Sequence, residues 1–204
     1  MIQVKRTEIT CVVYGLCLSD PTEQPPPYGC LVAQNCCQMG KMAAAWLLQR
    51  GHERIGFVSE VAPPGLWLSQ WISGYRLYAV ERGLALDPCF VHFTGKQDAV
   101  GRTAAEAFAA LRDPPTGFLI PEPRVAASFI RARDARGLPV EHHAVVMGKD
   151  PLRARVEGLN DWPCIFTEES HMASALFTTL ARAVQHTTLP GETVLLSPDH
   201  IRLP

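Results

Sequence analysis

Apolar positions along the chain follow two different spacings, and segments of the two kinds alternate. Helical spacing of three and four residues is found at Val100, Ala104, Phe108 and Leu111 and again at Met172, Leu176, Leu180 and Val184. Five other runs are short and mostly apolar, as strands covered on both faces should be: RIGFVSE, CFVHFTG, TGFLIPE, HAVVMGK and CIFTE. This alternation predicts an α/β fold, a parallel sheet with helices on both faces.

Three of the expected helices end in the same dipeptide. Arg50-Gly51, Arg82-Gly83 and Arg136-Gly137 each follow a helical pattern and precede a strand-like run. Glycine just past a helix readily takes the left-handed C′ conformation, and an arginine before it is favoured by the negative end of the helix dipole. The junction therefore predicts capped helices that lead quickly into strands. In such sheets ligands bind beyond the carboxyl ends of the strands.

The two ends of the chain differ from this regular middle. ITCVVYGL is a single strand candidate, and it is followed by a proline-rich loop at residues 19–29. The final run, ETVLLSPDHIRLP, is strand-like and is expected to supply a sheet edge. Lys5 and Arg6 precede the first apolar run, as basic residues do in a secretory signal peptide, but Glu8 interrupts the basic region. We therefore interpret the run as a strand and expect a cytoplasmic protein.

Composition narrows the function classes. The 204 residues carry 19 basic and 20 acidic side chains, which gives a net charge of −1. The chain therefore has no excess of positive charge that would attract nucleic acid. No apolar run is long enough to cross a bilayer. The seven cysteines include no C-x-x-C pair and are expected to be mostly buried thiols of a reduced compartment. The sequence predicts no metal site and no cofactor.

Five stretches, taken in order, resemble the effector-binding core of LacI/GalR-type transcription regulators. They are QMGKMAAAWLLQRGHERIGFVSE, SQWISGYRLYAVERGLALDP, DPPTGFLIPEPRVAASFIRARDARGLPV, HAVVMGKD and PCIFTEESHMASALFTTLARAV. Each motif alone has low specificity for the family, but five motifs in the right order with compatible spacing are fairly specific. The resemblance covers nearly the whole chain and implies the periplasmic-binding-protein-like I fold, with one complete lobe and part of a second.

The resemblance also implies a division of the chain. Residues 1–33 are expected to be a partial first lobe, 34–166 the second, effector-binding lobe, and 167–204 the returning helix and strand of the first lobe. Family members begin with a helix-turn-helix headpiece, and nothing of that kind precedes ITCVVYGL here. The expected partners are a small-molecule effector, sugar-like or nucleoside-like, and a second copy in a homodimer. DNA is expected to be contacted only through the missing headpiece, and a membrane not at all.

The positions that match the family's ligand contacts carry unusual residues. Trp71 stands where the family usually has an arginine, Glu122 where it has an Asn-Asp loop, and Lys149-Asp150 where it has an aspartate pair. With His171, these are the expected ligand-binding residues, with Trp71 offering an aromatic face. The structural alternatives are a packed helix aromatic for Trp71, a solvated carboxylate for Glu122, a surface turn for 149–150 and a first-turn helix position for His171.

Three functions are compatible with these residues. A ligand sensor should gain thermal stability with its ligand. A dimerising remnant without a ligand should expose apolar positions, either on the helix from Val100 to Leu111 or on the helix from Met42 to Leu48. An enzyme is disfavoured, because no recognisable signature surrounds any cysteine that a histidine could activate. Those cysteines are Cys36, Cys37, Cys89 and Cys164, and the histidines are His52, His92, His142, His143, His171, His186 and His200.

Overall fold

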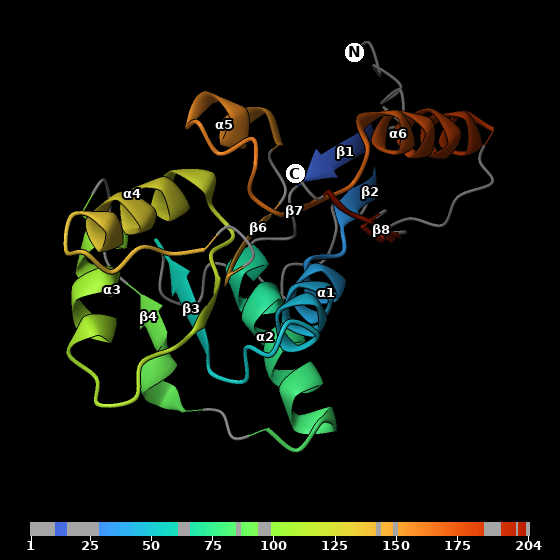
Figure 1. Cartoon of the computed structure of the whole chain (residues 1–204). Helices are drawn as coiled ribbons and strands as arrows, with labels where there is room; N and C mark the ends of the chain where they lie inside the picture. Colours follow the sequence, from blue (N-terminus) through green and yellow to red (C-terminus); the bar gives the residue numbers. More distant parts are fainter. Residues whose placement is uncertain are drawn as a thin grey trace, which may run out of the picture.

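The chain forms two mainly parallel sheets of unequal size, with segments that pass between them (Figure 1). The structure is a computed structural model, and it describes residues 11–15, 29–60, 66–84, 87–93, 99–141, 144–148, 151–185, 193–198 and 200–202. In Figure 1 most of the larger sheet and its helices lie below, the helix Pro151–Val156 (α5) stands at the upper left, and the smaller sheet lies with helix α6 (Glu169–Val184) at the upper right.

The larger sheet has six strands in the order β4-β3-β5-β6-β7-β9. Their bounds are β3 (Ile55–Ser59), β4 (Val91–Phe93), β5 (Gly117–Leu119), β6 (Val145–Gly148), β7 (Cys164–Phe166) and β9 (His200–Arg202). All neighbours are parallel except β9, which runs antiparallel to β7. Each of the five apolar runs therefore contains one parallel strand, which confirms the prediction of a parallel sheet.

Helices cover both faces of this sheet. They are α1 (Cys36–Leu48), α2 (Leu66–Glu81), α3 (Val100–Ala109), α4 (Pro123–Asp134) and α5 (Pro151–Val156), with a 3-10 turn η1 (Pro88–Phe90) before β4. One core cluster lies under α1 and α2, and the other under α3, α4 and α5. Phe118 and Leu119 are neighbours in β5 but enter opposite clusters, because side chains alternate along a strand. Burial on both faces explains why these runs are continuously apolar.

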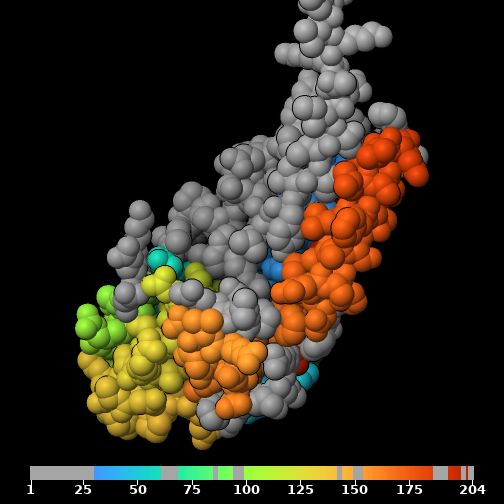
Figure 2. Space-filling model, turned by 90° about the horizontal axis from the view of Figure 1, so that it is seen from above, coloured from blue at the N-terminus to red at the C-terminus, as the bar shows by residue number. Residues whose placement is uncertain are grey.

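The smaller sheet contains β1 (Cys11–Gly15), β2 (Gly29–Gln34) and β8 (Thr193–Leu196), all parallel, in the order β1-β2-β8. Helix α6 packs on β1 and β2, and Figure 2 shows it running along the surface. The chain passes between the two sheets after β2, after β7 and after β8. The segments that leave β2 and β8 are in contact, because the Asn35 backbone N–H donates to the Leu196 carbonyl at 2.7 Å.

The end of the chain is more complex than the expected single strand. ETVLLSPDHIRLP contributes two strands, β8 at one edge of the smaller sheet and β9 at one edge of the larger sheet. Pro198 lies between them, and a proline lacks the N–H that would continue a ladder. The expected assignment of 167–204 to the first lobe therefore does not hold for His200–Arg202, which pairs with the larger sheet. The rest of the division stays a prediction.

The Arg-Gly junctions are helix caps, as expected. Gly51, Gly83 and Gly137 have φ values of 84°, 69° and 66°. The residue after each glycine donates its N–H to the carbonyl five residues earlier, for example His52 to Leu47 at 3.1 Å. This is the hydrogen bond of the Schellman motif, which satisfies a carbonyl at the helix end.

Helices α1 and α2 touch through their backbones. A Cβ on Gly74 would collide with the Cys37 carbonyl oxygen, and a Cβ on Gly40 with the Trp71 carbonyl oxygen. Glycine is the residue that allows such close backbone approach. The next residue, Tyr75, is buried, and its hydroxyl donates to the Ile55 carbonyl at 3.0 Å. The Gly-aromatic pair thus fixes α2 to α1 and to β3 at once.

We expect Gly74→Ala to lower the free energy of unfolding by about 1–3 kcal/mol or more, because the added methyl must separate two helix backbones. Urea unfolding followed by circular dichroism measures this change. Ser73→Ala is the matched control, since Ser73 is exposed on the same helix and should change stability by no more than about 0.5 kcal/mol. Equal midpoints for the two variants would contradict the close contact.

Candidate functional site

Buried polar side chains gather where strands end. Within the described residues the buried polar side chains are Gln34, Ser59, Thr167 and Thr179. The first two are the last residues of β2 and β3, and Thr167 follows β7 directly. Ser59 and Thr167 thus lie at the carboxyl edge of the larger sheet, where ligands of such folds bind, whereas Gln34 ends a strand of the smaller sheet. Burying polar groups there costs stability unless they are hydrogen-bonded, so we consider this edge the candidate site.

Backbone hydrogen bonds hold the strand ends together. The Gly148 N–H donates to the Pro121 carbonyl at 3.1 Å, which joins the end of β6 to the residue before Glu122. The Ser59 hydroxyl donates to Glu122 Oε1 at 3.1 Å, which joins β3 to the same loop. Glu122 is only partly exposed. The Glu122 carboxylate is therefore fixed at the strand ends by its hydrogen bond with Ser59 and is not freely solvated.

Trp71 lies on the same side of the sheet as these groups. Its side chain comes from α2, is fully buried and belongs to the core cluster under α1 and α2. A Cβ on Gly148 would collide with the six-membered ring of the indole, so the ring lies directly over the end of β6. Trp71 is thus a packed helix aromatic in this structure, the structural alternative considered above, and its role in ligand binding stays a prediction. The indole Nε1, however, has no hydrogen-bond partner among the described residues.

Thr167 is a candidate that sequence reasoning missed. It is 3% exposed, and its Oγ1 likewise has no hydrogen-bond partner in the described part of the chain. Two residues earlier, Ile165 pairs with Gly148 across the β6–β7 ladder. The sequence does contain a pattern that could have identified Thr167. A single polar residue directly follows an apolar run, as in GFVS and CIFT.

The remaining expected site residues are distributed differently. Lys149 and Asp150 directly follow Gly148 in the sequence but lie outside the described residues. His171 is exposed in the first turn of α6, which packs on the smaller sheet, and it does not join the buried polar group. Nearby on the same helix, Met172 accepts a hydrogen bond from Gln34 Nε2 at 3.5 Å. The structure thus brings Trp71 and Glu122 to one sheet edge and leaves His171 at the surface.

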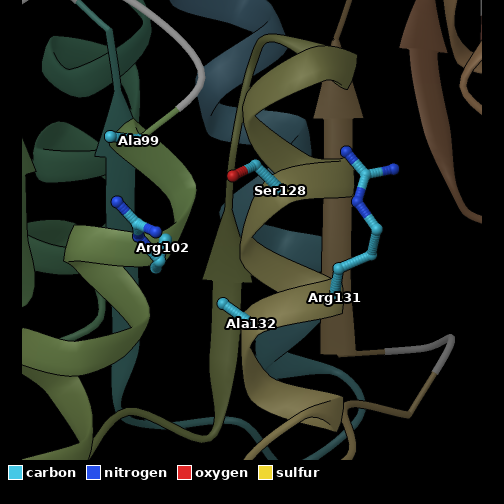
Figure 3. Close-up of a pocket in the computed structure, with 5 residues that line it drawn as sticks. All are labelled: Ala99, Arg102, Ser128, Arg131 and Ala132. Carbon is cyan, nitrogen blue, oxygen red and sulfur yellow. The ribbon is translucent and has the colours of Figure 1, made fainter.

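A hollow of about 530 Å³ lies elsewhere, between α3 and α4 (Figure 3). Ala99, Arg102, Ser128, Arg131 and Ala132 line it. Helices α3 and α4 cover the sheet face opposite to Trp71, so this hollow is separate from the strand-end group. Its two arginines and one hydroxyl provide no acid and base pair for catalysis.

The enzyme hypothesis gains nothing from the described residues. No group of three or more potential metal ligands occurs among them. Cys30, Cys36 and Cys164 are buried, whereas Cys89 is exposed. A hydrogen bond to Asp87 and the negative charge of Asp87 raise the pKa of the Cys89 thiol, which disfavours the reactive thiolate. No helix in the described part of the chain is long and apolar enough to cross a membrane.

Several solved structures that superimpose on this chain are described as transcription regulators. A CelR–cellobiose complex superimposes with a TM-score of 0.74 at 20% identity, over 94% of this chain and 57% of that one. A LacI-family regulatory protein from Chloroflexus aggregans gives 0.74 at 17% identity, over 92% and 65%. A LacI-family regulator from Enterococcus faecium with bound ribose gives 0.72 at 14% identity, over 95% and 68%.

These similarities establish the periplasmic-binding-protein-like fold that the sequence motifs implied. The chain spans 57% and 65% of the length of the first two neighbours. No protein-family model and no curated protein sequence matches it.

Asp87→Asn should accelerate alkylation of Cys89 near pH 8. Removing the negative charge lowers the raised thiol pKa, so more thiolate is present at that pH, while the asparagine still accepts the Cys89 backbone N–H. Iodoacetamide labelling with peptide mass spectrometry measures the rate, and Asp113→Asn, at another exposed acid, is the control. Rapid labelling of the unchanged chain at pH 7 would instead favour an activated cysteine.

Proposed function

We propose that this chain is the effector-binding part of a LacI/GalR-like transcription regulator, and that a small molecule binds at the carboxyl ends of the larger sheet. The observation that carries the proposal is the group of Ser59, Trp71, Glu122 and Thr167 at this edge. It includes a held carboxylate and two buried polar atoms that have no partner in the described residues. A ligand with hydroxyl groups can both accept from such donors and donate to the carboxylate.

The fold offers a way to transmit binding. Three segments pass between the two sheets, and Gln34 and Thr167 lie on two of them. A ligand that contacts these residues would favour one arrangement of the lobes over another by its differential affinity. In this proposal the movement is passed to the DNA-binding headpiece of a full-length regulator, and no catalytic step is involved.

The ligand is proposed to be sugar-like or nucleoside-like. Two structural neighbours hold cellobiose and ribose, and Lys149 and Asp150 would add polar contacts directly after β6. His171 is a weaker part of the proposal, because its exposed position on α6 gives it no place in the buried group.

Ligand binding should raise the melting temperature of the chain. Cellobiose, ribose, adenosine and uridine are suitable probes, and a compound at a hundredfold excess over its Kd should raise Tm by about 5–10 °C. Differential scanning fluorimetry measures the shift. Glu122→Gln should reduce it, because an amide replaces the accepting carboxylate, whereas Glu53→Gln at an exposed loop should preserve it. Failure of every compound would count against a ligand site.

A second candidate function is self-association, favoured by one face of α6. Phe177, Leu180 and Val184 are spaced as one helix stripe and are 73%, 40% and 61% exposed. A stripe of this kind on a soluble protein marks an interaction surface. The two helices first considered for this role bury most of these positions. Val100, Ala104 and Phe108 lie in the core, and so do Ala43, Ala44 and Leu47. We propose that α6 contacts a second copy of the chain.

The double variant Phe177→Glu, Val184→Glu should shift the protein from dimer to monomer, because two charges would be buried in the contact. Sedimentation velocity at several concentrations measures the change. Thr178→Glu, at an exposed neighbouring position outside the stripe, is the matched control and should remain dimeric. A wild-type chain that is monomeric at every concentration would contradict the contact.

A further inference from the structure

The hollow between α3 and α4 is formed by small side chains beside a close contact of the two helices. A Cβ on Gly101 would collide with the Val125 carbonyl oxygen, so the helix backbones meet at this point. Ala99, Ser128 and Ala132 line the hollow with short side chains that leave it open. Its volume of about 530 Å³ lies within the range of small-molecule sites.

Two cationic side chains flank a hydroxyl in this hollow. Figure 3 shows the Ser128 hydroxyl directed toward α3, with Arg102 of α3 on one side of it and Arg131 on the other side of α4. Both arginines are exposed, and Ser128 is partly exposed, so a molecule from solution can reach all three. Because α3 and α4 are packed against each other, the positions from which these side chains extend are fixed by the fold.

Neither arginine is neutralised by a described acidic residue. Glu106 lies one turn after Arg102 on α3, but its carboxylate pairs with Arg136 at 3.0 Å. Asp134 lies three residues after Arg131, yet Arg102 and Arg131 form no ion pair within the part of the chain that the structure describes. The residues that line the hollow therefore carry two positive charges and no negative one, which favours an anionic ligand.

We propose that this hollow binds a small molecule with two anionic groups, a dicarboxylate or a bisphosphate. One group contacts Arg102 and the Ser128 hydroxyl, and the other contacts Arg131. The N–H fork of a guanidinium group matches the paired oxygens of a carboxylate or a phosphate. Two separated anionic groups fit better than one, because a single group bound at one arginine leaves the other without a partner.

This site is additional to the effector site of the proposed function. Trp71 belongs to the core cluster under α1 and α2, whereas α3 and α4 cover the other face of the larger sheet. The five residues that line the hollow include none of the proposed effector contacts. Binding in the hollow can therefore be measured without an effector, and its failure would leave the proposed function standing.

Isothermal titration calorimetry on the whole chain tests the proposal with matched probes. Succinate, glutarate and adipate carry two carboxylates at increasing spacing, and butyrate carries one. Methylene bisphosphonate and methylphosphonate make the same comparison for phosphate-like groups. At low ionic strength, where screening is weak, we expect at least one dianion to bind about tenfold more tightly than its single-group counterpart, because a second charge-assisted contact forms. The two series distinguish a carboxylate ligand from a phosphate ligand.

Variants assign this binding to the hollow. Arg102→Gln and Arg131→Gln should each weaken the dianion about tenfold, because each removes one charged contact. Arg112→Gln is the matched control, since Arg112 is exposed after α3 and does not line the hollow, and it should leave the Kd unchanged. Ala132→Leu keeps both charges but fills the hollow, so it should also weaken binding, with circular dichroism to check that the variant is folded.

Four results would overturn the proposal. The first is absence of binding by every dianion, and the second is equal affinity for a dianion and its single-group counterpart. The third is equal weakening in Arg112→Gln and Arg102→Gln, which would indicate attraction to the whole basic surface. The fourth is loss of binding in Glu122→Gln, which would place the anion at the strand ends. Binding of poly-glutamate without binding of any dianion would assign the two arginines to an acidic protein partner instead.

Discussion

The close approach of α1 and α2 is the contact on which the candidate site depends. Gly40 and Gly74 let the two helix backbones meet, and a side chain at either position would separate them. The same turn of α2 carries Trp71, and Tyr75 anchors it to β3. Because the helix cannot move away from α1, the indole is held over Gly148 at the end of β6. A packing requirement between two helices thus fixes the position of a polar atom.

That contact also explains a conflict within the site. A rigid core stabilises the fold, but it leaves Nε1 of Trp71 and Oγ1 of Thr167 buried without described partners. Each such group reduces stability by about 1–3 kcal/mol. Natural proteins tolerate costs of this kind mainly at functional sites, where local rules are broken for the sake of binding. The proposed function places a ligand at these strand ends, because this is where ligands bind in folds of this kind.

The two sheets contribute differently to the molecule. The larger sheet is covered on both faces and holds two core clusters. The smaller sheet has three strands, and its helix α6 exposes an apolar stripe that includes Phe177. Three passages connect the two parts, and the proposed function uses polar residues at these passages, such as Gln34 and Thr167, to report a change in their arrangement. Binding and self-association are therefore proposed for separate parts of the structure.

The sequence by itself determined the local elements, because these depend on short-range chemistry. Continuous apolar runs specified buried strands, and Arg-Gly junctions such as Arg50-Gly51 specified helix caps. Trp71 and Glu122 were predicted as site residues only through the family resemblance, because their positions match its ligand contacts. Only the tertiary structure decided that Trp71 is fully buried, that the Thr167 hydroxyl is buried at the end of β7, and that the last strand joins the larger sheet. Burial and pairing are set by residues distant in the sequence, and a local pattern contains no information about which neighbours those will be.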